Sequence, residues 1–311
     1  MRFSSFLRLE SKLVARDKGA ILTTVLLAVV LLAGFFSGLQ ADRAETAALR
    51  MAAERVQEDW AAQPPKNPHT AAHYGILVYR PPAPLQGIEP GVLPYQGAVT
   101  FLEAHKRNAP MLSPASVRAA ESRYGGTRFS PMLQTAGGFL ALVIGFLVGS
   151  RESRRGMAAL LRGAGTRGGS MVAAKAIVTG ALVLAAATSS LIAGAFYLEG
   201  VDAAARFAVL AFASLIHLFV LAGIGVASGQ WLGSARFGLT AVAFAWGMSV
   251  LIIPRMADVV AEQATPLTQA ELDQIIAADF AEGPDGHGDT EANEVFEREI
   301  LAEYGVETRD E

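Results

Sequence analysis

Long apolar runs separated by polar segments dominate the pattern of this 311-residue chain. Residues 19–39 contain no Asp, Glu, Lys or Arg, and four later runs share this character. Because a helix rises about 1.5 Å per residue, some 20 residues cross a hydrocarbon core of roughly 30 Å. The pattern predicts an all-α polytopic membrane protein with about five transmembrane helices, at residues 19–39, 131–150, 176–198, 207–228 and 237–254.

The first run has a rival interpretation as a cleaved signal peptide. Residues 1–18 place five basic side chains before it, as a signal peptide also would. However, the run is longer than the usual apolar region of roughly 7 to 15 residues, and no small-x-small cleavage site closes it. We therefore expect an uncleaved signal anchor.

The segment 40–130 is expected to form an external, mostly helical domain. Residues 41–60 are charged and Ala-rich with one apolar helical stripe, so the first helix should continue beyond the membrane. Gln-Pro-Pro at 63–65 should end it. Residues 76–79 and 98–102 are the plausible short strands of this domain.

Capping signals predict three further helices outside the membrane. Ser-Pro at 113–114 matches an N-cap followed by Pro at the first helical position. In the segment 255–311, Thr268 opens a capping box, and Thr290 would cap a second helix that stops at Gly305. The sequence predicts two amphipathic helices in this last segment.

Basic residues are concentrated in three segments, which predicts the orientation of the chain. Residues 1–18 hold five Lys and Arg, residues 151–175 hold six, and the turn 229–236 holds Arg236. Short loops rich in Lys and Arg stay in the cytoplasm when spans are inserted. The N-terminus is therefore expected to be cytosolic, with residues 40–130, 199–206 and the acidic 255–311 outside.

Composition agrees with this reading and removes several kinds of site. The chain is 52% hydrophobic and 18% charged, and its mean hydropathy is +0.34. It is therefore more apolar than ordinary soluble domains. It has no cysteine, so neither disulfides nor thiolate metal ligands are available. It also lacks the G-x-x-x-x-G-K-[ST] phosphate-binding loop, so any use of ATP would require another chain.

The basic segment 151–175 holds the main candidate site. Met157, Leu160 and Leu161 fall at i, i+3 and i+4, so a short helix starting near Glu152 would present one apolar face among arginines. Such a helix suits docking to a cytosolic partner. The charge alone fits equally well with arginines that only set the topology.

Histidines provide the other candidate chemistry. His69, His73 and His105 lie in the external segment, but they lack the H-E-x-x-H pattern and a recognisable ligand spacing, so we expect no bound metal. His217 lies in the middle of the fourth run, where ionisable groups are functional candidates. A neutral histidine that hydrogen-bonds a neighbouring helix is an equal alternative. Residues 285–289 lack the features of a calcium loop and favour a polar linker.

Several short motifs carry a resemblance to a known family. They are Pro-His-x-Ala-x-His-Tyr-Gly at 68–75, Leu-Glu-Ala-His at 102–105, Gly-Ser-Ala-Arg at 233–236, and the series Glu152, Gly156, Leu160, Leu161, Gly165 and Lys175. With the order of spans and external segments, they resemble bacterial type-2 ABC exporter permeases. More closely, the chain is similar to the subgroup related to the permease of the multicopper-enzyme (nitrous oxide reductase) maturation transporter.

The resemblance implies a transport subunit of the bacterial inner membrane, without enzymatic activity or a cofactor. Residues 152–165, in the cytoplasmic loop 151–175, would form a coupling helix on a separate cytosolic ATPase. The permease would pair with itself or with a second permease, and no nucleic-acid partner is expected. Residues expected at the ATPase are Glu152, Arg154, Arg155, Gly156, Met157, Leu160, Leu161, Gly165 and Lys175, with Arg236 in a second cytosolic turn.

Two further expectations accompany the resemblance. Family members usually continue through a longer second external domain into a final span, whereas this sequence ends at Glu311. The acidic segment is therefore expected to be a truncated form of that domain. The alternative function is a membrane-anchored assembly factor for an exported metalloenzyme, and a third interpretation as a membrane metalloprotease lacks a complete catalytic set.

Overall fold

A computed structural model describes most of the chain. The described residues are 3–68, 71, 73–91, 93, 97–102, 110–111, 127–154, 168–198, 200, 202–232, 235–264 and 291–305. The chain divides into a helical unit (Met1–Ala48, Pro81–Tyr95 and Pro114–Arg255) and a sheet unit (Leu49–Arg80, Gln96–Ser113 and Met256–Glu311). The helices predicted to open at residues 113–114 and at Thr268 lie outside the described residues.

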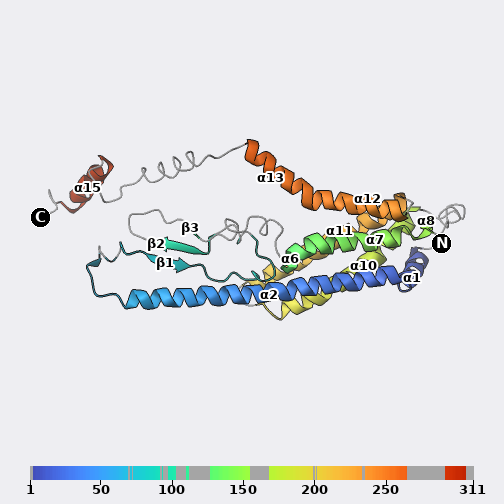
Figure 1. Ribbon diagram of the computed structural model, residues 1–311, viewed down its shortest axis with the longest axis horizontal. Helices are drawn as coiled ribbons and strands as arrows, with labels where there is room; N and C mark the ends of the chain where they lie inside the picture. The colour runs from blue at the N-terminus through green and yellow to red at the C-terminus, as the bar shows by residue number, and fades with distance from the viewer. Residues whose placement is uncertain are drawn as a thin grey trace. The chain divides into compact units, whose positions relative to one another are not determined.

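Helices make up most of the described structure (Figure 1). In chain order they are α1 (Phe3–Val14), α2 (Lys18–Ala61), α6 (Phe129–Met132), the π-helical η1 (Leu133–Gly137), α7 (Gly138–Gly149), α8 (Arg151–Arg154), α10 (Gly168–Ala195), α11 (Ala203–Trp231), α12 (Ala235–Gly247), the π-helical η2 (Met248–Ile252), α13 (Ile253–Ala264) and α15 (Glu291–Tyr304).

Five helical stretches of the described residues are long and apolar enough to cross a membrane. They are Lys18–Ala61, Phe129–Gly149, Gly168–Ala195, Ala203–Trp231 and Phe237–Ala261. The predicted all-α polytopic fold with five spans is confirmed. By helix length and hydropathy, the chain is a multi-pass membrane protein.

The long helix α2 supplies one wall of the helical unit. It is a continuous helix of 44 residues that ends at Ala61, shortly before Pro64 and Pro65, so the predicted extension beyond the first apolar run is confirmed. Within the helical unit only one stripe of it is buried, at Ala20, Leu27, Leu31, Gly34, Phe35 and Gly38. Spacings of three, four and seven residues place that stripe on one face, while apolar residues elsewhere on α2 remain exposed, as expected of a lipid-facing surface.

The core of the helical unit lies between α2, α7, α10 and α11. Phe35 of α2 and Ile144 of α7 pack there with Val183 of α10 and Leu218 of α11. Each of these four side chains is at most 1% exposed. Burying apolar side chains in this way favours packing of the helices in one arrangement, and dispersion contacts supply much of the gain within a bilayer.

Glycines bring α7 and α11 into backbone contact. A Cβ atom added at Gly145 would overlap the carbonyl group of Ala222, and one added at Gly225 would overlap a carbonyl of α7. Gly149 and Gly229, four residues further along each helix, make the same close approach. Small residues four apart allow two helix backbones to approach closely in a membrane. These glycines therefore let α7 and α11 pack with their backbones in contact.

The last span passes through a proline. η2 ends two residues before Pro254, which lies in the first turn of α13. Proline lacks the N–H that an α-helix would use and clashes with the carbonyl four residues earlier. A π-helical turn at this place relaxes the ladder of hydrogen bonds ahead of the proline, which allows the helix to continue.

A loop of the helical unit docks on α2 at the end opposite α1. Arg128 donates a hydrogen bond to the carbonyl oxygen of Gln86 at 2.7 Å and forms an ion pair with Glu45 at 3.1 Å. The N–H group of Ser130 donates to the carbonyl oxygen of Ile88 at 3.2 Å. These bonds fix residues 83–89 against the start of the second span.

The sheet unit contains a three-stranded antiparallel sheet in the order β1 (Ile76–Tyr79), β2 (Val99–Leu102) and β3 (Pro110–Met111). The two predicted strands are confirmed, and β3 is an addition to them. Gly75 has a φ of +65° with the Phe101 ring against it, so a side chain would be both strained and obstructed there. The helix α15 ends at Gly305, which has a φ of +67°, as predicted.

Candidate functional site

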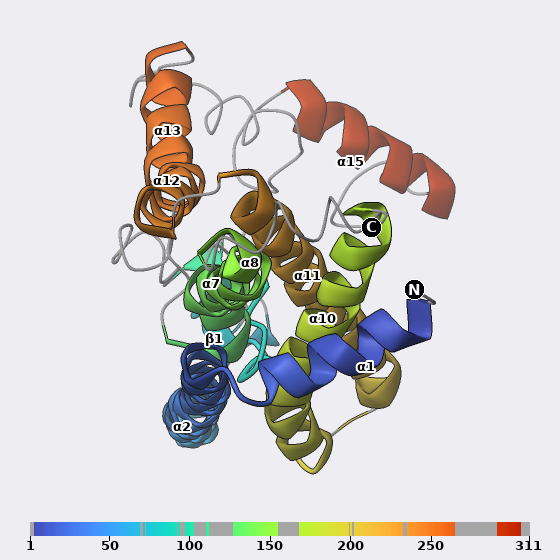
Figure 2. The same cartoon turned by 90° about the vertical axis from the view of Figure 1, so that its right-hand side faces the viewer.

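Five charged side chains meet inside the helical unit at the end where α1 and α8 lie (Figures 1 and 2). They come from α1, the turn before α2, α8 and α10. We refer to them as the ion network: Glu10, Asp17, Arg151, Glu152 and Lys175. The network lies at both ends of the predicted cytoplasmic loop 151–175, since α8 opens that loop and the first turns of α10 close it.

Lys175 is the centre of the ion network. Its Nζ atom lies 2.9 Å from Glu152 Oε1 and 3.2 Å from Glu10 Oε1, and it donates to the carbonyl oxygen of Val148 at 3.0 Å. These three partners match the three N–H donors of an ammonium group. The side chain is 0% exposed. A lysine buried this completely requires such partners, because an unpaired charge would be costly to remove from water.

Arg151 joins the other side of the network. Its Nη1 atom lies 3.0 Å from Glu10 Oε2, and its Nε atom lies 3.5 Å from Asp17 Oδ2. Glu10 therefore bridges two cations with its two carboxylate oxygens. Asp17 also accepts the N–H groups of Gly19 and Ala20 at 3.1 and 3.2 Å through Oδ1, so it caps the first turn of α2.

The ion network ties three parts of the chain together. Glu10 anchors α1, Arg151 and Glu152 anchor α8, and Lys175 anchors α10. Three acids and two bases leave one excess negative charge. Buried ion pairs contribute little net stability, but breaking one by removing a single partner is strongly destabilising. The arrangement therefore fixes the geometry of the α8 and α10 ends with respect to α1.

The structure places only part of the predicted coupling site. Glu152 and Lys175 pair with each other inside the helical unit, while Arg154 belongs to α8 and Arg236 to α12. The remaining predicted residues lie outside the described residues: Arg155, Gly156, Met157, Leu160, Leu161 and Gly165. Contact between this segment and an ATPase stays a prediction.

Glu10, Asp17 and Arg151 are site residues that sequence reasoning missed. The available signal was Lys175 itself, which directly precedes an uncharged run of 23 residues at 176–198. A cation buried among packed spans requires an anionic partner, and Glu152 is the only acid in residues 151–175. Glu10 carried no comparable signal, because its partner Arg151 is 141 residues away.

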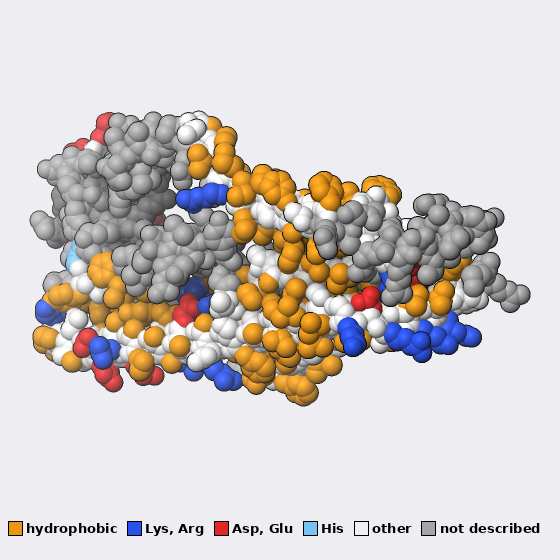
Figure 3. Space-filling model, turned by 45° about the vertical axis from the view of Figure 1, so that its right-hand side comes forward, with side chains coloured by type: hydrophobic (Ala, Val, Ile, Leu, Met, Phe, Trp, Pro, Cys, Tyr) orange, Lys and Arg blue, Asp and Glu red, His pale blue; other side chains and the backbone are white. Residues whose placement is uncertain are grey.

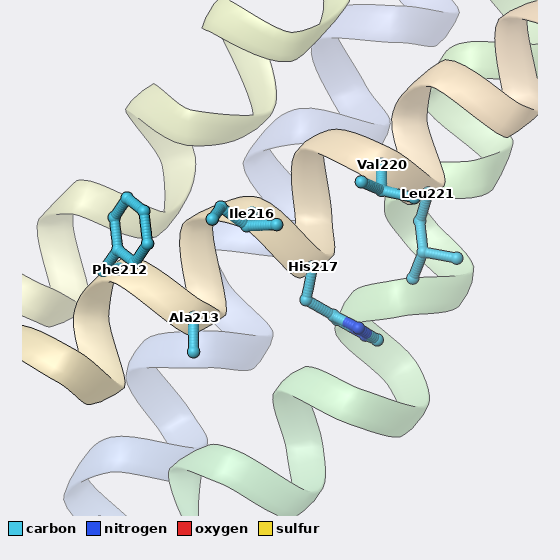
Figure 4. A pocket seen from close by; sticks show the side chains of 6 residues that line it. All are labelled: Phe212, Ala213, Ile216, His217, Val220 and Leu221. Atoms are coloured by element: carbon cyan, nitrogen blue, oxygen red, sulfur yellow. The ribbon is translucent and has the colours of Figure 1, made fainter.

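A second candidate is the hollow on α11 around His217 (Figure 4). Its volume is about 490 Å³, and it is lined by Phe212, Ala213, Ile216, His217, Val220 and Leu221. The His217 side chain extends toward the neighbouring helix drawn in pale green. Its Nε2 atom is buried without a hydrogen-bond partner among the described residues. None of the described residues that line the hollow is acidic, and His217 stays without an assigned role.

No protein-family model, curated protein or solved structure matches this chain. Within the described parts of the chain, no group of three or more His, Asp or Glu residues is placed to hold a metal ion. His73 lies in the turn before β1, whereas His69 and His105 lie outside the described residues. Function is therefore inferred from the ion network and from the segment whose ends it holds.

Proposed function

We propose that this protein is the membrane-spanning permease subunit of an ABC transporter of the type-2 exporter kind. The segment between α8 and α10 would dock on a separate cytosolic ATPase, and two permeases would form the translocation path. The observation that carries the proposal is the ion network, which braces both ends of this basic segment against the helical unit. A loop that only marks topology has no need of such bracing.

The packing of the helical unit supplies a route for mechanical coupling. α8 follows α7 directly, and α7 is in backbone contact with α11 through its glycines. A displacement of the docked segment would therefore move α7, α10 and α11 together as packed helices. ATP-driven closure of the ATPase subunits would in this way reach the permease interface and produce alternating access.

The proposal requires residues 151–175 to be cytosolic and the acidic segment 255–311 to lie outside. Reporters that are active on only one side of the membrane, fused after Gly169 and after Asp310, should give opposite signals. The reason is the strong excess of Lys and Arg in the first segment and of Asp and Glu in the second. Equal signals at both positions would contradict the five-span topology.

Docking of the segment is tested by Leu160→Asp combined with Leu161→Asp. If the apolar face enters an ATPase groove, losing a buried leucine costs on the order of 2 kcal/mol and weakens the complex roughly thirtyfold. Two introduced charges should abolish both co-purification of the ATPase and stimulation of its activity. Abundance and membrane insertion should stay unchanged, because every transmembrane run is intact.

The matched comparison is Arg154→Ala with Arg155→Ala. Charges at the rim of an interface affect association rate and salt sensitivity more than affinity, so this pair should lose only part of the ATPase. The difference from the wild type should shrink at high salt, because salt screens the charges that the variant lacks. Wild-type yield of ATPase with the double-Asp protein would reduce the segment to a topology signal. If that protein still supports assembly of an exported metalloenzyme, the assembly-factor alternative would replace the transport proposal.

A further inference from the structure

The first helix runs across the direction of the spans. α1 is separated from α2 by only three residues, and in Figure 2 α1 crosses the view while the start of α2 is seen nearly end-on. Because α2 carries a complete membrane span, a helix that runs across the direction of its start lies along the membrane surface. Phe6, Glu10 and Val14 form the buried side of α1, and α10 packs against it.

Both acids of this N-terminal segment are occupied by partners within the protein. Glu10 is 3% exposed and is occupied by Arg151 and Lys175, while Asp17 pairs with Arg151 and caps α2. Neither carboxylate is therefore available to neutralise a basic side chain on the outer surface of α1.

The cations of the same segment point outward. Arg8, Lys12, Arg16 and Lys18 are all exposed, and none forms an ion pair within the described residues. Arg8, Lys12 and Arg16 follow one another at intervals of four, which places the first two on one side of α1 and the third just beyond its end. Lys and Arg side chains gather visibly at this end of the helical unit (Figure 3).

Exposed apolar side chains adjoin these cations. Phe3 and Leu9 of α1 are each 44% exposed. Directly after Lys18, the exposed residues Ile21, Leu22 and Val25 begin the lipid-facing surface of α2. The cations thus lie where the apolar surface of a span gives way to the membrane surface, which is the level of the phospholipid headgroups.

We propose that α1 and the turn after it form an interfacial anchor that binds the headgroups of anionic phospholipids, such as phosphatidylglycerol, in the surrounding bilayer. Basic residues near an anionic surface attract it, and exposed apolar residues add to the binding by entering the interface. Because Glu10 and Asp17 are occupied by internal partners, the exposed charges of this face are all positive. A neutral partner would not require such a surface. The proposal rests on the membrane fold and is independent of the transport proposal.

The test measures how phosphatidylglycerol and phosphatidylcholine, titrated into the detergent-purified full chain, change its thermal unfolding midpoint. Phosphatidylglycerol should raise the midpoint, and phosphatidylcholine or inorganic phosphate should not. For Arg8→Gln with Lys12→Gln, the half-saturating concentration of phosphatidylglycerol should increase roughly thirtyfold, given a modest electrostatic contribution from each lost charge. The matched control, Arg50→Gln with Arg55→Gln, removes two exposed cations from the far part of α2 and should leave the titration unchanged.

A second measurement keeps the proposal falsifiable if the double variant misfolds. Raising the ionic strength should weaken the phosphatidylglycerol effect on the wild-type chain, because salt screens exposed charges. An equal response to both lipids, or an equal loss in the two double variants, would overturn the proposal. Since ATPase binding is not involved in either readout, failure here leaves the transport proposal intact.

Discussion

Lys175→Met is expected to prevent the helical unit from keeping its native packing. The substitution retains a long apolar stem but removes the ammonium group that contacts Glu10 and Glu152. Three acids would then face Arg151 alone. Breaking a buried pair by removing one partner costs about 3 to 5 kcal/mol, because the other charge is left buried. Complete domains are stable by only about 5 to 15 kcal/mol. The measurement is the unfolding midpoint and the monodisperse yield in mild detergent.

Two further variants separate charge loss from a general effect of substitution. Lys12→Met removes an exposed ammonium group of α1 and should leave the midpoint in neutral detergent unchanged. Lys175→Met combined with Glu152→Gln restores the single excess negative charge of the native network and should recover part of the lost stability. A wild-type midpoint for Lys175→Met alone would show that the side chain is not buried and paired as described.

Gly225→Ala is expected to be a strongly damaging single-methyl change in the spans. The added Cβ would overlap a backbone carbonyl of α7, which cannot move aside as a flexible side chain can. Overpacking of this kind typically costs about 1 to 3 kcal/mol. Because α7 and α11 would have to separate, the variant should have a lower unfolding midpoint. Limited proteolysis should also cleave α11 faster than in the wild type.

Gly223→Ala is the matched control on the same helix. No atom lies within 4 Å of the Cβ position at Gly223, so the methyl group has room. Alanine also favours a helix over glycine by about 1 kcal/mol in exposed positions, so this variant should be neutral or slightly stabilised. Equal midpoints for the two variants would mean that the glycine contact between α7 and α11 does not form.

Hydropathy predicts the spans of this protein well because its physical basis is local. Whether a segment crosses a bilayer depends on the summed hydrophobicity of consecutive residues. The run 19–39 can therefore be recognised without knowledge of the rest of the fold. The strands 76–79 and 98–102 were predictable for a similar reason, since β-branched and aromatic residues there are bounded by turn residues. The end of α15 at Gly305 follows from the backbone freedom of glycine.

The ion network was not predictable, because pairing between charges is set by the fold. The basic segments were recognised as a class, and their positive charge was assigned to topology. Arg151 is one of these basic residues, yet its side chain is only 4% exposed and pairs with Glu10, which lies 141 residues earlier in the chain. The same limit applied to α1, whose exposed cations became informative only once both neighbouring acids were found to be occupied by internal partners.

The most direct test of the transport proposal uses the absence of cysteine from this chain. Leu160→Cys creates a single thiol, to which a short photoactivated cross-linker can be attached in membranes that contain the whole transporter. We predict an adduct with a protein that carries the G-x-x-x-x-G-K-[ST] phosphate-binding loop, and a yield that changes when ATP is added. A chain that inserts normally and yields no ATPase adduct from position 160, or whose thiol there is labelled only from outside the cell, would contradict the proposal.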